Sequence, residues 1–196
     1  MRPASIPYLL IGFRLGTGLV IAPVAALAGG PAQYLCAALL ALGVLSDIFD
    51  GVIARRIGSV TDRLRTFDSR TDLVFWIGVT IAMLVLHPAL FASTWPMVAI
   101  LGAMEVTTHA VSFARFRKEA SPHHLLSKLF GLGLWGLITW LMIKGSGGPL
   151  QWAVFALGVA SQLEALAITL ALPSWRCDVK GVGQALALRK AAAEAA

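Results

Sequence analysis

Six long apolar stretches decide what this chain can fold into. Hydrophobic residues make up 58% of its 196 residues and charged residues only 13%, whereas a soluble domain has about a quarter charged residues. Each stretch has about the 20 residues that an α-helix needs to cross the hydrocarbon core of a bilayer. The sequence therefore predicts an all-α integral membrane protein, with six transmembrane helices over residues 7–28, 33–54, 68–87, 92–113, 125–144 and 149–172.

The basic residues give the expected orientation of these spans. Fifteen of the sixteen Lys and Arg lie near alternate ends of the apolar stretches, and only Lys144 lies at the other ends. Because cytoplasmic loops carry the excess of Lys and Arg in membrane proteins, both termini are expected in the cytoplasm. This distribution accounts for the net charge of +6 without a nucleic-acid partner. The expected partners are membrane lipids and not nucleic acid.

The domain organisation follows from the same pattern. Residues 1–173 are predicted to form one transmembrane domain, and residues 174–196 a cytoplasmic C-terminal tail. The stretch Ala185 to Ala195 is rich in helix-forming residues. It is expected either to lie on the anionic membrane surface or to fray, and the sequence leaves both open.

Four aspartates stand out in a chain that has only ten carboxylates. Asp47 and Asp50 are three residues apart, and Asp68 and Asp72 are four apart. On helices, each spacing places both carboxylates of a pair on one face. Four such charges near a membrane repel one another unless cations lie between them. Oxygen ligands in this number suit Mg²⁺ or Mn²⁺, so the sequence predicts a divalent-metal site.

The residues around the aspartates indicate a phosphorylated ligand. The connection over residues 57–61 is short enough for the two acidic faces to meet. Gly51 and Ala54 carry little side-chain bulk, which is expected to leave room for a ligand. Arg55 is a candidate to hold a phosphate oxygen.

At these positions the chain resembles the CDP-alcohol phosphotransferases, whose signature is D-x2-D-G-x2-A-R-x8-G-x3-D-x3-D. The residues that match, with every spacing kept, are Asp47, Asp50, Gly51, Ala54, Arg55, Asp68 and Asp72. The resemblance also covers the six spans, and it implies the six-helix bundle of that family.

The resemblance implies a metal-dependent reaction in phospholipid biosynthesis. A substituted phosphate would pass from a CDP-linked donor, CDP-diacylglycerol in the commoner arrangement, to an alcohol acceptor with release of CMP. Two Mg²⁺ or Mn²⁺ ions per active site are expected, held by Asp47, Asp50 and Asp68 with help from Asp72. Asp72 is also the expected catalytic base for the acceptor hydroxyl. The resemblance further implies a homodimer. The orientation given by the basic residues places the four aspartates at the cytoplasmic ends of the second and third spans, so the active site is expected on the cytoplasmic side of a membrane, in a bacterium the inner membrane.

One position departs from the family pattern. The second signature glycine is replaced by Leu64, at a place where the glycine is expected to leave space beside the nucleotide. Leu64 is therefore a candidate to contact the cytidine. Either the donor remains CDP-linked with local repacking, or this chain uses a different activated donor.

Polar residues inside the later spans are candidates for binding the acceptor. Glu105 and His109 lie four residues apart in the fourth span, and Glu164 lies at a similar depth in the sixth. Charged residues inside a span usually face a cavity. A mutual hydrogen bond between Glu105 and His109, without a ligand, is the alternative.

Two roles are possible for each of three other basic residues. Arg115 and Lys128 are candidates to bind the phosphate of an acceptor or a lipid, although topology alone also explains them. Arg14 in the first span either reaches to the headgroups or forms a structural ion pair. His123 and His124 are expected to be exposed on a loop.

Three other functions are compatible with the sequence. A CDP-linked aminoalcohol could be transferred to a lipid alcohol, which reverses the roles of lipid and polar substrate. The acidic residues could belong to a divalent-cation transporter, because intramembrane carboxylates also mark ion pathways. The chain could also be an inactive metal-binding paralogue, which the replacement at Leu64 favours.

Overall fold

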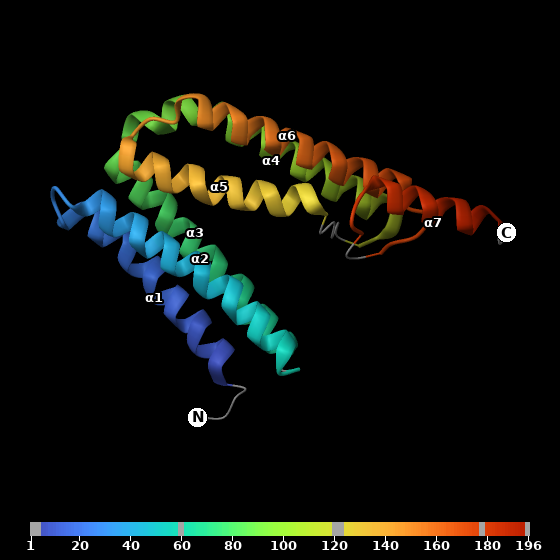
Figure 1. The fold of residues 1–196 in the computed structure, drawn as a ribbon, viewed down its shortest axis with the longest axis horizontal. Helices are drawn as coiled ribbons and strands as arrows, with labels where there is room; N and C mark the ends of the chain where they lie inside the picture. The colour runs from blue at the N-terminus through green and yellow to red at the C-terminus, as the bar shows by residue number, and fades with distance from the viewer. Residues whose placement is uncertain (1–4, 59–60, 119–123, 177–178, 195–196) are drawn as a thin grey trace. The chain divides into compact units, whose positions relative to one another are not determined.

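The fold is helical throughout the part of the chain that the structure describes. This computed structural model describes residues 5–58, 61–118, 124–176 and 179–194, and it leaves out the side chains of residues 62, 63, 65 and 69. The helices of the described residues are α1 (Ile6–Leu27), α2 (Ala32–Arg56), α3 (Asp62–Leu86), α4 (Pro88–Phe116), α5 (Leu125–Lys144), α6 (Gly148–Ala171) and α7 (Val182–Glu194) (Figure 1).

The first six helices are long and apolar enough to cross a membrane. The prediction of an all-α membrane protein with six spans is therefore confirmed. The main difference is at α3, which begins at Asp62 instead of at the predicted residue 68. Thr61 explains the early start, because its Oγ1 accepts a hydrogen bond from the Leu64 N–H at 3.2 Å and so caps the helix. Asp68 and Asp72 consequently lie inside a helix and share one of its faces.

The chain divides into two compact units. The first unit is Met1–Ala92 with Ile138–Ser146, and it contains α1, α2 and α3. The second unit is Ser93–Leu137 with Gly147–Ala196, and it contains α6, α7 and most of α4 and α5.

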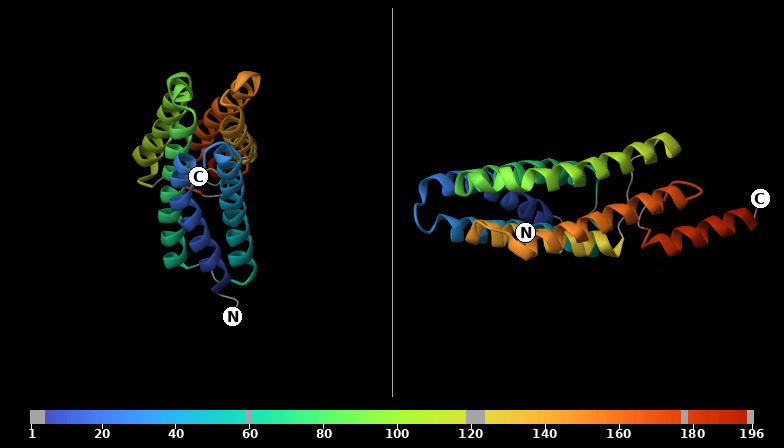
Figure 2. Two further views of the ribbon diagram at one scale, coloured as in Figure 1. Left: turned by 90° about the vertical axis from the view of Figure 1, so that its left-hand side faces the viewer. Right: turned by 90° about the horizontal axis from the view of Figure 1, so that it is seen from above.

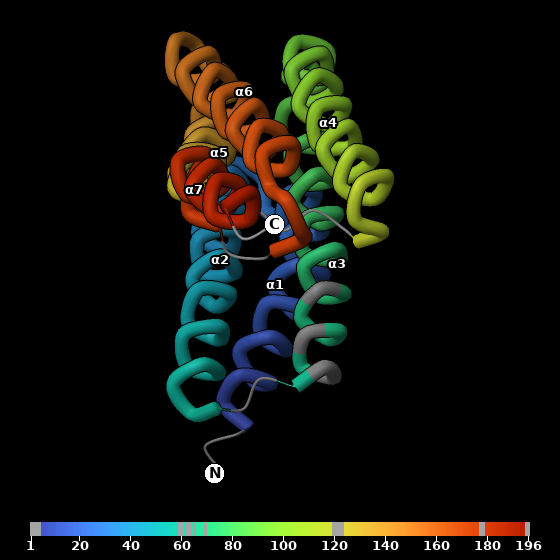
Figure 3. Tube along the Cα trace, turned by 90° about the vertical axis from the view of Figure 1, so that its right-hand side faces the viewer, coloured from blue at the N-terminus to red at the C-terminus, as the bar shows by residue number. Residues whose placement is uncertain are grey.

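In the first unit α1 lies between α2 and α3, as Figures 2 and 3 show from opposite sides. Small residues allow α1 and α3 to approach closely. A Cβ atom added to Gly78 would overlap the Gly18 carbonyl, and one added to Gly18 would press on the backbone of Phe75. The Phe75 ring in turn lies where a side chain on Gly43 of α2 would be. Glycines at helix contacts thus bring the three backbones together, as is common in membrane helices.

In the second unit α7 packs against the end of α6. Ala185 is completely buried in an apolar cluster with Ile168 of α6, with Leu172 just after α6, and with Val179. Phe116 and Leu188 pack against this cluster. The stretch that the sequence marks as helix-forming is therefore a helix as far as Glu194, the last described residue, and Ala185 is covered by its own chain.

Candidate metal centre

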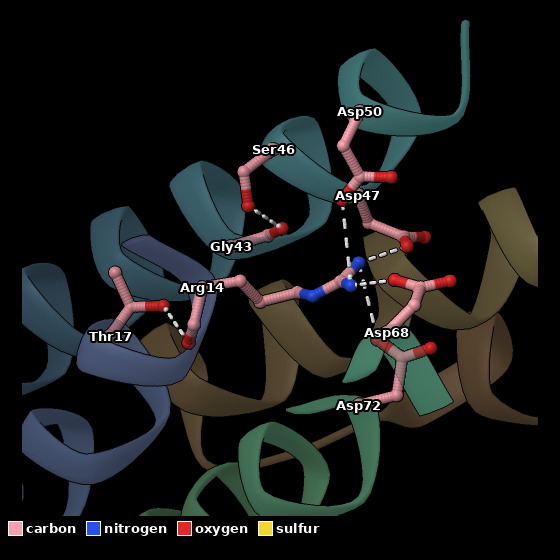
Figure 4. A network of polar contacts seen from close by, with 8 residues as sticks. All are labelled: Arg14, Thr17, Gly43, Ser46, Asp47, Asp50, Asp68 and Asp72. Atoms are coloured by element: carbon pink, nitrogen blue, oxygen red, sulfur yellow. Dashed lines mark hydrogen bonds and ion pairs between the residues drawn. The ribbon is translucent and has the colours of Figure 1, made fainter. Parts of the chain in front are cut away.

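The four aspartates converge on one guanidinium group in the first unit (Figure 4). Asp47 and Asp50 come from α2, Asp68 and Asp72 from α3, and Arg14 from α1. Arg14 Nη1 forms ion pairs with Asp47 Oδ1 and, at 3.2 Å, with Asp72 Oδ1. Arg14 Nη2 forms ion pairs with Asp68 Oδ1 and, at 3.5 Å, with Asp50 Oδ2. We call these five residues the aspartate ring.

The ring is buried on one side and open on the other. The side chain of Arg14 is only 1% exposed and that of Asp50 only 6%. The side chains of Asp47, Asp68 and Asp72 are between 36% and 49% exposed. A ligand can therefore reach three of the four carboxylates, while Arg14 and Asp50 form the floor.

Two hydroxyl groups near the ring are bonded within their own helices. The Thr17 hydroxyl donates to the Arg14 carbonyl at 2.8 Å, and the Ser46 hydroxyl donates to the Gly43 carbonyl at 2.7 Å (Figure 4). Both partners lie within the helix of the donor, so these hydroxyls are satisfied locally. They add no charge to the ring.

The carboxylates fit a divalent cation by geometry and by charge. Asp47, Asp50 and Asp68 each offer an oxygen, and these oxygens lie within 4.8 Å of one another. Asp50 Oδ2 is buried, and apart from its 3.5 Å ion pair with Arg14 it has no hydrogen-bond partner among the described residues. When ionised, the four carboxylates exceed the charge of Arg14 by three negative charges. Hard oxygen donors with uncompensated charge are the environment that Mg²⁺ and Mn²⁺ prefer.

The predicted nucleotide-binding residues divide into two pairs. Arg55 is exposed, and its guanidinium lies over Gly51, where an added Cβ atom would be 3.3 Å from Nη1. Ala54 and Leu64 are instead buried, at 4% and 6% exposure, in an apolar cluster with Ile11 of α1. Arg55 is therefore accessible beside Gly51, whereas Ala54 and Leu64 pack the three helices together.

Arg14 is the ring residue that the sequence did not place at the site. Of its two readings, the ion pair is confirmed and the reach to the headgroups is wrong, because the side chain is buried. Its position inside an apolar span was the available signal, since a charge there needs a partner. The spacing of the aspartates alone could not show that the partner would come from α1.

The other candidate residues lie in the second unit. Arg115 donates to three carbonyls at or just after the end of α6, those of Thr169 and Leu170 at 2.6 Å and that of Leu172 at 3.2 Å. It also lies over the Phe116 ring, 5.0 Å from its centroid. The guanidinium therefore caps a helix end, where carbonyls lack partners and a cation is favourable. Lys128 is exposed on α5.

Glu105 and His109 form the mutual hydrogen bond that the sequence offered as an alternative. His109 Nε2 lies 2.9 Å from Glu105 Oε1. Gln162 of α6 donates from Nε2 to the other oxygen, Glu105 Oε2, at 2.6 Å. Both carboxylate oxygens of Glu105 therefore have a partner, and the carboxylate links α4 to α6.

Glu164 pairs with a histidine that was expected elsewhere. Glu164 Oε2 lies 2.9 Å from Nδ1 of His124, and the His124 side chain is only 1% exposed. The expected exposure of His124 is therefore wrong, because the buried imidazole pairs with a half-buried carboxylate on α6. His123 lies outside the described residues.

The comparison with protein families decides what kind of protein carries this ring. The family model for CDP-alcohol phosphatidyltransferase matches residues 4–169, which include all five ring residues, the first five spans and all but the last two residues of the sixth. The chain belongs to the CDP-alcohol phosphatidyltransferase family. No curated protein and no solved structure matches it.

Family membership confirms the resemblance seen in the signature aspartates. A CDP-alcohol phosphatidyltransferase is a transferase of substituted phosphate groups, and this member is a multi-pass integral membrane protein of phospholipid biosynthesis. The identities of its donor, acceptor and cation are finer questions.

Proposed function

We propose that this protein transfers the phosphatidyl group of CDP-diacylglycerol to the hydroxyl of a polar alcohol, with release of CMP. The observation that supports this most is the aspartate ring, which combines the family's acidic residues with an open side. The acceptor oxygen forms a new bond to the phosphorus, the bond between phosphorus and the leaving CMP breaks, and the hydroxyl proton moves to a base. The reaction needs no oxidant or further substrate.

The metal ligands in this proposal are Asp47, Asp50 and Asp68, with Asp72 beside them. Their oxygens would hold two Mg²⁺ or Mn²⁺ ions. Bound there, the cations would neutralise charge on the leaving pyrophosphate oxygen and polarise the phosphorus. Asp72 is 39% exposed, so an acceptor hydroxyl can approach it, and its role is to orient this hydroxyl and take its proton.

The donor site is proposed to lie over Gly51 and Arg55. Arg55 presents an exposed guanidinium, which can hold a phosphate oxygen by paired hydrogen bonds. The burial of Leu64 supports a CDP-linked donor, since a side chain within the helix core does not project over an exposed nucleotide. The replaced glycine therefore gives no reason to prefer another activated donor.

The environment of the site is part of the proposal. The basic residues near the ends of α2 and α4 support an active site on the cytoplasmic side of a bacterial inner membrane. A homodimer is proposed from the family resemblance alone. Cation transport has less support, because the buried Arg14 closes the floor of the ring.

An assay of CMP release tests this function. The purified protein is incubated with Mg²⁺ or Mn²⁺, CDP-diacylglycerol and a panel of polar alcohols. We expect CMP release that requires both the metal and one class of alcohol, and a fall of at least about 100-fold in Asp72→Asn, the scale of general-base catalysis. Glu194→Gln, an exposed carboxylate on α7, is the matched control and should keep full activity. Metal uptake into vesicles without CMP release would instead indicate a transporter.

A further inference from the structure

We infer that Arg14 is the built-in counter-ion of the aspartate ring, and that its guanidinium competes with a divalent cation for the same carboxylate oxygens. This inference rests on the metal site of the proposed function. It assigns to the first helix a role in setting how tightly that site holds its metal.

The first step concerns which oxygens Arg14 occupies. Its two terminal nitrogens contact one oxygen from each of the four aspartates. Three of these aspartates, Asp47, Asp50 and Asp68, are also the group that is compact enough to hold a metal ion. Arg14 and a cation therefore need the same side chains, and binding of one must weaken the contacts of the other.

The second step concerns what anchors Arg14. Its side chain is 1% exposed, and its Nε atom is buried without a hydrogen-bond partner among the described residues. The hydrogen bonds that fix its charged end go to Asp47 and Asp68. The guanidinium is thus held in place by the carboxylates and not by backbone carbonyls, so it can shift when the carboxylates turn to another cation.

The third step concerns charge. Four carboxylates close together in a span would repel one another strongly, and the positive charge of Arg14 reduces this repulsion. It leaves an excess of three negative charges, which still attracts divalent cations. Arg14 therefore stabilises the ring without metal and, for the same reason, lowers its affinity for metal.

The test measures Mn²⁺ affinity by electron paramagnetic resonance on the purified full-length protein without nucleotide. All variants are purified in Mn²⁺ and then stripped with a chelator. Arg14→Met removes the charge but keeps an apolar chain, and we expect it to bind Mn²⁺ at least about tenfold more tightly, because a cation a few ångströms away is gone. Arg14→Lys keeps one charge without the planar fork, so its affinity should fall between those of the wild type and Arg14→Met.

Arg70→Gln is the matched control. Arg70 is exposed on α3, two residues from both Asp68 and Asp72 and hence away from their shared face. Its Mn²⁺ affinity should stay within about twofold of the wild-type value, because exposed charges are screened by salt. As a second readout, Arg14→Met should lower the melting temperature in chelator, and Mn²⁺ should restore it.

The direction of the change separates competition from a purely structural role. Loss of a residue that only supports the fold would weaken metal binding, whereas loss of a competitor strengthens it. Unchanged or weaker Mn²⁺ binding in folded Arg14→Met overturns the inference. If Arg14→Met does not fold, unchanged or weaker Mn²⁺ binding in Arg14→Lys overturns it. Wild-type protein that binds no Mn²⁺ contradicts the proposed metal site as well, whereas normal wild-type binding and CMP release would leave the proposed function intact.

Discussion

The two units pair their charged side chains in different ways. In the first unit, four carboxylates share one guanidinium, and three of them are open to solvent or ligand. In the second unit, Glu105 is matched by His109 and Gln162, and Arg115 is matched by carbonyls at the end of α6. The aspartate ring therefore keeps an unbalanced charge, whereas the Glu105 carboxylate and the Arg115 guanidinium have their partners within the second unit.

This difference indicates where chemistry is possible. A carboxylate whose oxygens are already bonded to neighbouring side chains must break these bonds before it can bind a ligand. The four ring carboxylates share the single positive charge of Arg14, so their remaining negative charge can still bind a divalent ion. Charge imbalance, more than the presence of acidic residues, distinguishes the ring from the polar contacts between α4 and α6.

The largest expected effect comes from breaking the helix contact that assembles the ring. In Gly78→Leu the new side chain would overlap the Gly18 carbonyl, and a backbone atom cannot yield. We expect a loss of at least about 3 kcal/mol in the free energy of unfolding, at the upper end of overpacking costs, together with loss of Mn²⁺ binding. Thermal unfolding followed by fluorescence measures the first, and Mn²⁺ titration the second.

Gly102→Leu is the control for this substitution. Gly102 lies in α4 of the second unit, and an added Cβ atom there has no neighbour within 4 Å. Its stability and Mn²⁺ affinity should match those of the wild type. Equal stability of the two variants would show that close packing of α1 on α3 does not hold the first unit together.

A smaller effect is expected at Arg115, where the second unit uses a charge for structure. Arg115→Met removes the donors to the carbonyls of Thr169, Leu170 and Leu172. We expect a loss of about 2 kcal/mol in stability, which is typical for hydrogen bonds to a charged group, with no change in the KM for the alcohol. Arg189→Met, an exposed arginine on α7, should change neither quantity. Unchanged stability with a raised KM would instead support the phosphate-binding role predicted from the sequence.

The sequence predicted the spans and the family well because both depend on local patterns. Apolar length gave six helices, and fixed spacing gave the aspartates. The partners of isolated charges could not be read in this way, since they depend on which helices pack together. Arg14 meets Asp68 because Gly18 and Gly78 let α1 fit closely against α3, and it meets Asp47 because α1 also packs on α2. His124 is buried for a similar reason, because Glu164 reaches it from α6.

The smallest expected effect is at Glu105, where it tests whether a carboxylate with both oxygens already paired takes no part in binding the alcohol. Glu105→Gln keeps an oxygen that can accept a hydrogen bond, and its amide can donate to Gln162 Oε1, which has no partner among the described residues. We expect a change in stability of at most about 0.6 kcal/mol, the average for polar contacts between membrane helices. The KM for the alcohol should stay within about twofold, because both oxygens of Glu105 are already bonded to neighbouring side chains.

Glu105→Leu separates the two possible roles of this carboxylate. It leaves both His109 and Gln162 without their shared acceptor, so a structural role predicts lower stability in Glu105→Leu than in Glu105→Gln, with the same KM in both. Binding of the alcohol by the charged carboxylate predicts the reverse pattern, a KM raised in both variants at similar stability. Kinetics over a range of alcohol concentrations, combined with thermal unfolding of the same preparations, distinguishes the two. A raised KM would mean that Glu105 of the second unit also binds the alcohol. Charge imbalance would then no longer distinguish the ring from the other carboxylates among the described residues.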